Sequence, residues 1–198
     1  MTQLRAEPYW FLRHGETDWN ARHLSQGRTD IPLNETGLTQ ARLAGRQLAD
    51  LFEAGMRPFT HIVSSPLKRA FVTAEHVRDA IRDRTGLDLP LIKDADLQEV
   101  SFGVQEGQPM GDWYNTWING TFVPEKGEDF LTLKTRGVQA LNRAQEAGEG
   151  APLIVAHGAL FRGLRAAMGL EINVRLPNAV PLKAMPEEEG WVLKLLSA

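Results

Sequence analysis

Short apolar runs alternate with helical patterns along most of the chain, and no other feature constrains the fold as strongly. The strand-like runs are short and rich in β-branched, aromatic or aliphatic residues, and they lie at 9–12, 61–64, 89–92 and 152–156. Apolar residues spaced three to four positions apart predict helices over about 38–51, 67–81, 138–144 and 160–168. This alternation predicts an α/β fold: a doubly wound, mostly parallel sheet with helices on both faces.

Several helix boundaries carry local signals. Asn34 or Thr36 is a suitable N-cap for the first long helix. For the next helix, Ser65 is the expected cap and Pro66 the expected first-turn residue. Two apolar stretches in the tail predict a hairpin or a pair of edge strands, at 180–185 and 191–196.

The segment from about 104 to 132 interrupts the regular pattern. It contains Gly, Pro and several aromatic residues, but no convincing strand or long helix. Long irregular segments in compact domains are often lids or binding loops. We therefore expect one domain, residues 1–198, with an irregular lid insertion at about 104–132. Its aromatic residues are as consistent with a small satellite core as with a ligand site.

Composition excludes several classes of protein. The formal net charge of -3 gives no general attraction to nucleic acid or to an anionic membrane. The absence of Cys excludes disulfides and thiolate catalysis. No apolar run approaches the roughly 20 residues that span a bilayer, and no signal peptide is recognisable at the start. A cytoplasmic protein is the simplest interpretation, and the sequence leaves the oligomeric state open, a homo-oligomer included.

Two histidines directly follow predicted strands. His14 comes after the first strand and His157 after the fourth. Each is followed by a glycine, Gly15 or Gly158, whose missing Cβ is expected to let a ligand approach the backbone. In open α/β sheets, ligands bind beyond the carboxyl ends of the strands, so both histidines are candidates for a functional site.

Two arginines are expected at the same sheet edge. Arg13 precedes His14, and Arg69 lies in the first turn of the helix that follows the second strand. Each residue alone has an ordinary structural explanation. A cluster of cations in a chain with net negative charge, however, points to a phosphate-sized anion.

Five ordered motifs now give the chain a family resemblance. They are Arg13-His14-Gly15-Glu16-Thr17-x-x-Asn20, Gln26-Gly27-x-x-Asp30-x-Pro32-Leu33, Ser64-Ser65-Pro66-Leu67-x-Arg69-Ala70, Glu99-x-x-Phe102-Gly103 and His157-Gly158-x-x-x-Arg162. This series, which runs from about residue 9 to residue 169, resembles the histidine phosphatase superfamily, also called the phosphoglycerate mutase-like family. The chain departs from the family pattern at Gln105, where a Trp often stands.

The resemblance implies a role for each matching residue. His14 would be the nucleophile that forms a phosphohistidine, and Glu99 the proton donor to the leaving oxygen. The phosphate pocket would be lined by Arg13, Asn20, Arg69, His157 and Gly158. Gln26, Gly27 and Arg28 are candidate substrate contacts, although a surface role for Arg28 is equally open. Positioned cations suit phosphoryl transfer because charge spreads over the equatorial oxygens in the transition state.

Two competing functions receive little support: a metal-dependent hydrolase, and an inactive relative that binds phosphorylated ligands. The five histidines, at 14, 23, 61, 76 and 157, show no HxH or HExxH spacing, so we expect no metal and no other cofactor. A catalytically inactive relative that binds a phosphorylated ligand would be expected to lack the nucleophile or its cations, and none is missing here.

The stronger alternative is a cofactor-dependent phosphoglycerate mutase. Such mutases carry additional Arg and Lys in an insertion after the acid Glu. Between residues 101 and 133 this chain has one basic residue, Lys126, and five acidic ones, Glu106, Asp112, Glu125, Glu128 and Asp129. An acidic, aromatic lid favours a phosphatase acting on a small phosphate monoester with an apolar or neutral remainder.

Overall fold

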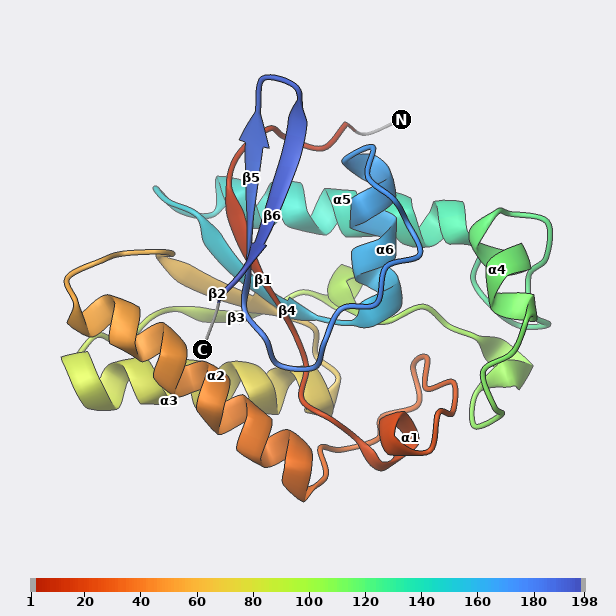
Figure 1. The fold of residues 1–198 in the computed structure, drawn as a ribbon, viewed down its shortest axis with the longest axis horizontal. Coiled ribbons are helices and arrows are strands. Elements are labelled where there is room, and N and C mark those ends of the chain that lie inside the picture. The colour runs from red at the N-terminus through yellow and green to blue at the C-terminus, as the bar shows by residue number, and fades with distance from the viewer. Residues whose placement is uncertain (1–2, 197–198) are drawn as a thin grey trace.

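The computed structural model describes residues 3–196 and has a six-stranded sheet at its centre, with strand order β3-β2-β4-β1-β5-β6 (Figure 1). The strands are β1 (Tyr9–Arg13), β2 (His61–Ser64), β3 (Leu91–Lys93), β4 (Pro152–Ala156), β5 (Leu182–Glu187) and β6 (Gly190–Leu195). Strands β1 to β4 pair in parallel, whereas β5 pairs antiparallel with β1 and with β6. The predicted α/β class and the tail hairpin are therefore confirmed.

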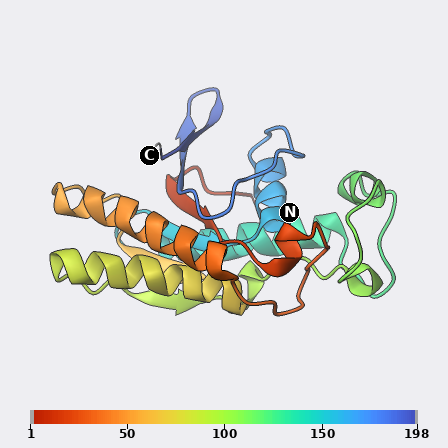
Figure 2. The same cartoon turned by 60° about the horizontal axis from the view of Figure 1, so that its bottom comes forward.

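Two layers of long helices cover the sheet. Helices α2 (Glu35–Glu53) and α3 (Lys68–Thr85) lie side by side on one face, and α5 (Phe130–Glu146) and α6 (Gly158–Ala167) pack together on the other (Figure 2). Strand β1 shows why its sequence is continuously apolar. Tyr9 and Phe11 face one hydrophobic cluster, and Trp10 and Leu12 face the other, because side chains alternate across a sheet that is buried on both sides.

Helix boundaries follow the sequence signals only in part. Asn34 is the N-cap of α2, and its side chain accepts a hydrogen bond from the Gly37 amide at 2.8 Å. The expected cap at Ser65 is wrong, because α3 begins after Leu67. The Ser65 amide instead continues the sheet ladder by donating to the Val155 carbonyl at 3.0 Å. The third strand also starts two residues later than expected, at Leu91.

The lid segment is less irregular than expected. It contains a short helix, α4 (Trp113–Ile118), and begins beside two 3-10 turns at Ala95–Leu97 and Gly103–Gln105. Tyr114 and Trp117 pack with Phe102 and Phe130 inside the cluster under α5 and α6. The lid aromatics thus extend one of the two main cores and do not form a separate satellite.

One more helix, α1 (Asp18–Ala21), follows β1 and contains Asn20, the last residue of the first motif.

No helix among residues 3–196 is both long enough and apolar enough to cross a membrane.

Candidate active site

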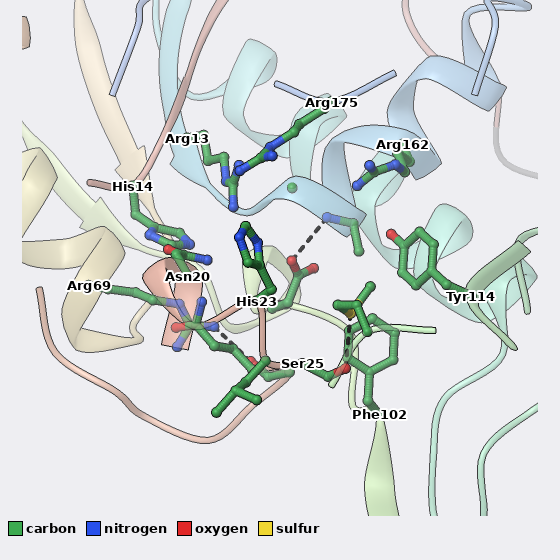
Figure 3. A pocket seen from close by; sticks show the side chains of 17 residues that line it. Arg13, His14, Asn20, His23, Ser25, Arg69, Phe102, Tyr114, Arg162 and Arg175 are labelled. Carbon is green, nitrogen blue, oxygen red and sulfur yellow. Dashed lines mark hydrogen bonds between the residues drawn. The ribbon is translucent and has the colours of Figure 1, made fainter. Parts of the chain in front are cut away.

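A cavity of about 290 Å³ lies at the carboxyl ends of β1 and β4 (Figure 3). Ligands of open α/β sheets bind beyond these ends of the strands. Eight of the residues predicted from the sequence line the cavity: Arg13, His14, Asn20, Gln26, Gly27, Arg69, Glu99 and Gly158. In Figure 3, His14, Asn20 and Arg69 gather on one side of the cavity, and Phe102 and Tyr114 stand on the other. The topology therefore brings together motifs that are far apart in the chain.

The His14 side chain is held in a single tautomer. Its Nδ1 lies 2.6 Å from the Gly15 carbonyl, which can only accept a hydrogen bond, so Nδ1 carries the proton. Burial lowers the pKa of His14 well below its usual value, and the charges of Arg69 and Arg13 lower that pKa further. A neutral imidazole therefore presents Nε2, which has no hydrogen-bond partner in the described chain, to the cavity.

His157 lies behind His14, with their ring centroids 5.2 Å apart. Its Nε2 is 2.7 Å from the Ser65 hydroxyl. Ser65 therefore forms a hydrogen bond with His157 and does not cap α3. Burial, followed by the charge of Arg69, keeps the pKa of His157 well below its usual value. Its Nδ1 is buried and has no partner among the described residues.

Arg13 and Arg69 are each held by backbone carbonyls and not by carboxylates. Arg13 donates to the Leu176 carbonyl at 2.7 Å, and Arg69 donates to the carbonyls of Gly27 and Thr29 at 2.7 and 2.9 Å. Burial lowers the pKa of both guanidinium groups to about 10, so both stay charged at neutral pH. In each arginine, Nε is buried without a partner in the described residues.

Two unpartnered guanidinium donors thus lie near the nucleophile candidate. Buried polar atoms without partners are rare in folded proteins, and three of the six in the described part of the chain belong to the predicted phosphate pocket: Nε of Arg13, Nε of Arg69 and Nδ1 of His157. The other three are in Trp10, Trp113 and Gln145. Asn20 adds a further donor. Its Oδ1 accepts from the Thr17 amide, so its amide NH₂ is left for the cavity that it lines. Such a set of donors matches an oxyanion with several acceptor oxygens.

Glu99 lies at the amino end of α6. Its carboxylate accepts hydrogen bonds from the Val100, Ala159 and Leu160 amides, each at 3.0 Å. The last two are free amides of the first helical turn, which is why an acidic side chain fits there. Since Glu99 also lines the cavity with His14, the predicted acid and nucleophile share one space.

Gly15 and Gly158, which follow the two histidines, have different neighbours. A Cβ on Gly15 would lie 2.4 Å from the Gly37 carbonyl oxygen, so Gly15 allows α2 to approach the end of β1. The expectation that Gly15 gives a ligand access to the backbone is therefore wrong. Gly158, in contrast, lines the cavity.

Glu106 anchors the loop that carries the second motif. Its carboxylate accepts from the Arg28 and Thr29 amides at 3.0 and 2.9 Å, and also from the Thr29 hydroxyl. Gly27 has a φ of 56° and leaves no room for a Cβ beside that carboxylate. Because the Gly27 and Thr29 carbonyls hold Arg69, Glu106 positions Arg69 through the loop.

Arg28 is not brought into the cavity lining. Its guanidinium donates to the Glu99 carbonyl at 3.3 Å and lies 3.5 Å from the Glu128 carboxylate. Arg28 is exposed, which agrees with the surface role that was considered beside substrate contact.

The opposite wall contains residues that the sequence analysis missed. They are His23, Leu24, Ser25, Phe102, Met110, Tyr114, Ala159, Arg162 and Arg175. Arg162 stands in the last motif, one helical turn after Gly158, and that spacing could have placed it on the same face of α6. Arg175 follows α6 in an irregular segment and carries no sequence signal.

Main-chain hydrogen bonds join two segments of this wall. The Ser25 amide donates to the Gln108 carbonyl at 2.9 Å, and the Gly107 amide donates to the Ser25 carbonyl at 2.8 Å. The Met110 amide donates to the carbonyl of His23, whose φ of 56° is unusual for a residue other than glycine. The lid is thereby attached to the loop that leads to Gln26.

The acidic residues of the lid face away from the cavity. None of the five lines it in the described part of the chain: Glu106, Asp112, Glu125, Glu128 and Asp129. Glu128 pairs with Arg136 at 2.6 Å, and Asp129 caps α5. The expectation that an acidic lid faces the organic part of the substrate is therefore wrong, and Glu106, Glu128 and Asp129 instead bind groups of the protein's own loops and of α5. Within residues 3–196, no three acidic or His side chains are grouped in a way that could hold a metal ion.

Comparisons with known proteins show the family of the chain. A model of the histidine phosphatase superfamily (branch 1) matches residues 9–197. A probable phosphoglycerate mutase, GpmB, from Yersinia pestis strain Pestoides F is 34% identical over 199 residues, which cover 92% of this chain and 86% of that relative. A mycobacterial glucosyl-3-phosphoglycerate phosphatase in complex with VO3 is 27% identical, with a TM-score of 0.76 over 98% of this chain and 100% of that one. A protein described as mycobacterial hydrolase 1 has a TM-score of 0.78 at 27% identity, over 98% and 99% of the two chains.

Proposed function

The chain belongs to the histidine phosphatase superfamily, and on that premise we propose that it hydrolyses small phosphate monoesters through a phosphohistidine on His14, with Glu99 as the proton donor. The observation that carries the proposal is the neutral His14 ring beside the unpartnered guanidinium donors of Arg13 and Arg69. A phosphate dianion would satisfy those donors and would lie next to the free Nε2.

In the first step, the Nε2 lone pair of His14 attacks phosphorus, and the bond between phosphorus and the ester oxygen breaks. Arg13 and Arg69 stabilise the charge on the equatorial oxygens. The departing oxygen takes a proton from Glu99 and leaves as an alcohol. Glu99 is suited to this role by its position, because it lines the same cavity as His14.

In the second step, water attacks the phosphohistidine. Glu99, now a carboxylate, accepts a proton from the water as the oxygen bonds to phosphorus. The bond between phosphorus and Nε2 breaks, which releases inorganic phosphate and restores the neutral imidazole. The hydrogen bond from Nδ1 to the Gly15 carbonyl keeps the ring in the same tautomer throughout.

The proposal is tested by trapping the intermediate. Brief exposure to ³²P-labelled substrate followed by rapid quench is expected to leave acid-labile, alkali-stable label on His14. Incorporation at another residue, or no intermediate under single-turnover conditions, would show that the covalent mechanism is wrong. Hydrolysis of p-nitrophenyl phosphate that depends on His14 would separate an enzyme from an inactive phosphate-binding relative.

A phosphoglycerate mutase is the second candidate, and two observations favour it. The curated relative is named a probable phosphoglycerate mutase, and two further arginines, Arg162 and Arg175, line the cavity. Incubation with 3-phosphoglycerate and bisphosphoglycerate discriminates the two activities. A phosphatase releases inorganic phosphate, whereas a mutase produces 2-phosphoglycerate without net release.

A further inference from the structure

His23 has a backbone conformation that a histidine rarely adopts. Its φ of 56° lies in the left-handed region, which glycine occupies without steric strain. The residue lies just beyond the end of α1. There the Leu24 amide donates to the Trp19 carbonyl at 2.8 Å, and the His23 amide donates to the Asn20 carbonyl at 3.1 Å. This pair of hydrogen bonds is a Schellman motif, whose left-handed position usually holds glycine. A histidine there makes the fold less stable than a glycine would.

The strained residue carries a free side chain into the cavity. His23 is exposed and lines the cavity, and its ring projects into it in Figure 3. The ring has no hydrogen bond, ion pair or ring contact within residues 3–196. The described fold therefore gives no reason for a histidine at this glycine position. Strained backbone conformations cluster at active sites and ligand-binding positions, so the reason lies in what the cavity binds.

The polar side chains that line the cavity are mostly hydrogen-bond donors. The donors among them include Arg13, Asn20, Gln26, Arg69, Arg162 and Arg175. Several oxygens that could accept are already engaged by the protein. The Thr17 amide donates to Oδ1 of Asn20, and the Thr17 hydroxyl donates to Oε1 of Gln26. The Glu99 carboxylate accepts from three backbone amides. These donors suit a phosphate group, but they leave few free acceptors for the organic part of a substrate.

The ring of His23 supplies such an acceptor. A neutral imidazole has one nitrogen that donates and one that accepts a hydrogen bond. Among the described lining residues only His14 and His23 have a side-chain nitrogen that can accept, and Nε2 of His14 faces phosphorus in the proposed reaction. The organic part of a substrate extends from the phosphate toward the mouth of the cavity, and the exposed His23 lies at that mouth.

We propose that His23 is a specificity-determining residue whose accepting ring nitrogen binds a hydroxyl group on the organic part of the substrate. The substrate class is then a phosphate monoester of a polyol, and this inference rests on the proposed function. A carboxylate or a second phosphate dianion has no proton to donate to that nitrogen. An ammonium group has one, but the arginines of the cavity repel it. The fold gives up stability at His23 so that the ring stands in the cavity.

The test begins with two substrates that differ in their hydroxyl groups. Glycerol 3-phosphate and propyl phosphate share a three-carbon phosphate ester, but only glycerol 3-phosphate carries hydroxyl groups on the other two carbons. Wild-type kcat/KM is expected to favour glycerol 3-phosphate by about three- to tenfold, as one hydrogen bond between neutral groups implies. Equal kcat/KM for the two compounds would overturn the proposal.

His23→Gly and His23→Ala both remove the ring. Each is expected to lower kcat/KM for glycerol 3-phosphate more than that for propyl phosphate, so that the preference falls to less than about twofold. The two variants differ in the backbone. Glycine relieves the left-handed strain and is expected to raise Tm by about 2–4 °C, whereas alanine keeps the strain. A histidine with only a structural role would give a lower Tm in His23→Gly and the same preference as wild type.

Lys126→Gly is the matched control. Lys126 is also exposed and has a φ of 60°, but it lies in the lid segment and does not line the cavity. The control is expected to raise Tm by a similar amount and to keep the preference for glycerol 3-phosphate. An unchanged preference in His23→Ala or His23→Gly, or an equal loss of preference in Lys126→Gly, would contradict the role of His23.

The outcomes separate this inference from the proposed function. His14-dependent hydrolysis of p-nitrophenyl phosphate without any preference for glycerol 3-phosphate over propyl phosphate would overturn the role of His23 alone. No hydrolysis of any of the three compounds would overturn the proposed function, and the role of His23 with it.

Discussion

The two walls of the cavity are built in different ways. The wall around His14 comes from the ends of β1 and β4 and from the first turn of α3, and its His14, Arg69 and His157 side chains are almost fully buried. The wall around Arg162 combines α6, the lid helix α4 and irregular segments, and several of its side chains are partly exposed. We expect the first wall to determine the chemistry and the second to select the organic part of the substrate, since specificity residues are commonly carried by loops on a rigid scaffold.

Removing the nucleophile is the most severe test of this division. His14→Ala is expected to lower turnover of every phosphate monoester by at least about 10⁴-fold, because no other group on that wall presents a free imidazole nitrogen to phosphorus. Steady-state assays with p-nitrophenyl phosphate, together with the labelling experiment, measure the effect. His76→Ala is the matched control, since His76 lies on α3 and does not line the cavity. Activity within tenfold of wild type in His14→Ala would contradict the assignment.

Glu99→Gln is expected to separate the two halves of the reaction. For an alkyl phosphate, which has a poor leaving group, kcat is expected to fall by about 10²- to 10⁴-fold, the usual range for a lost general acid. For p-nitrophenyl phosphate, whose leaving group needs no proton, the phosphorylation step is expected to change little. Burst and steady-state rates for the two substrates measure this difference. An equal loss of both phosphorylation rates would mean that the variant only disturbs the start of α6.

Glu106→Gln tests whether the loop positions Arg69. The Arg28 and Thr29 amides donate to different oxygens of Glu106, so the NH₂ group of a carboxamide must face one of them, and the loop and Arg69 are expected to shift. We expect kcat/KM to fall about tenfold and the inhibition constant of vanadate to rise by a similar factor, as loss of one charged hydrogen bond implies. Glu125→Gln, at an exposed lid position, is the control. Unchanged vanadate inhibition in Glu106→Gln would show that Glu106 does not position Arg69.

The smallest effect concerns stability and pH. His14 and His157 are buried in the neutral form, and burial holds the pKa of each well below 6.5. Below pH 6.5 the unfolded chain therefore binds protons that the folded chain does not, so the free energy of unfolding falls as pH falls. The loss is up to about 1.4 kcal/mol per pH unit for each histidine, and it is absent well above pH 6.5.

Urea unfolding at pH 7.5, 6.5 and 5.5 measures this dependence. His157→Asn is expected to reduce the slope by the contribution of one histidine. The same slope in wild type and in His157→Asn would show that His157 does not stay neutral in the folded protein.

The sequence predicted the wall built from strand ends much better than the opposite wall. His14, Arg69 and His157 each stand one to five residues after a short apolar strand, and a parallel sheet must bring such positions to one edge. Arg175 lies in an irregular segment after α6, where its direction depends on tertiary packing that no local pattern encodes. The number of acidic residues in the lid also gave a wrong prediction of what faces the substrate. Glu106 binds backbone amides of a loop, and Glu128 pairs with Arg136.

The hydrogen bonds between Ser25 and the segment at Gly107 and Gln108 have a consequence for the thermodynamics of binding. They order the second wall when the chain folds, so the backbone there loses its conformational entropy before a substrate arrives. Binding then needs to immobilise only the ligand and a few side chains such as Arg175. Contacts made by the ligand can therefore contribute to affinity and discrimination, and are not used to order the backbone of a loop.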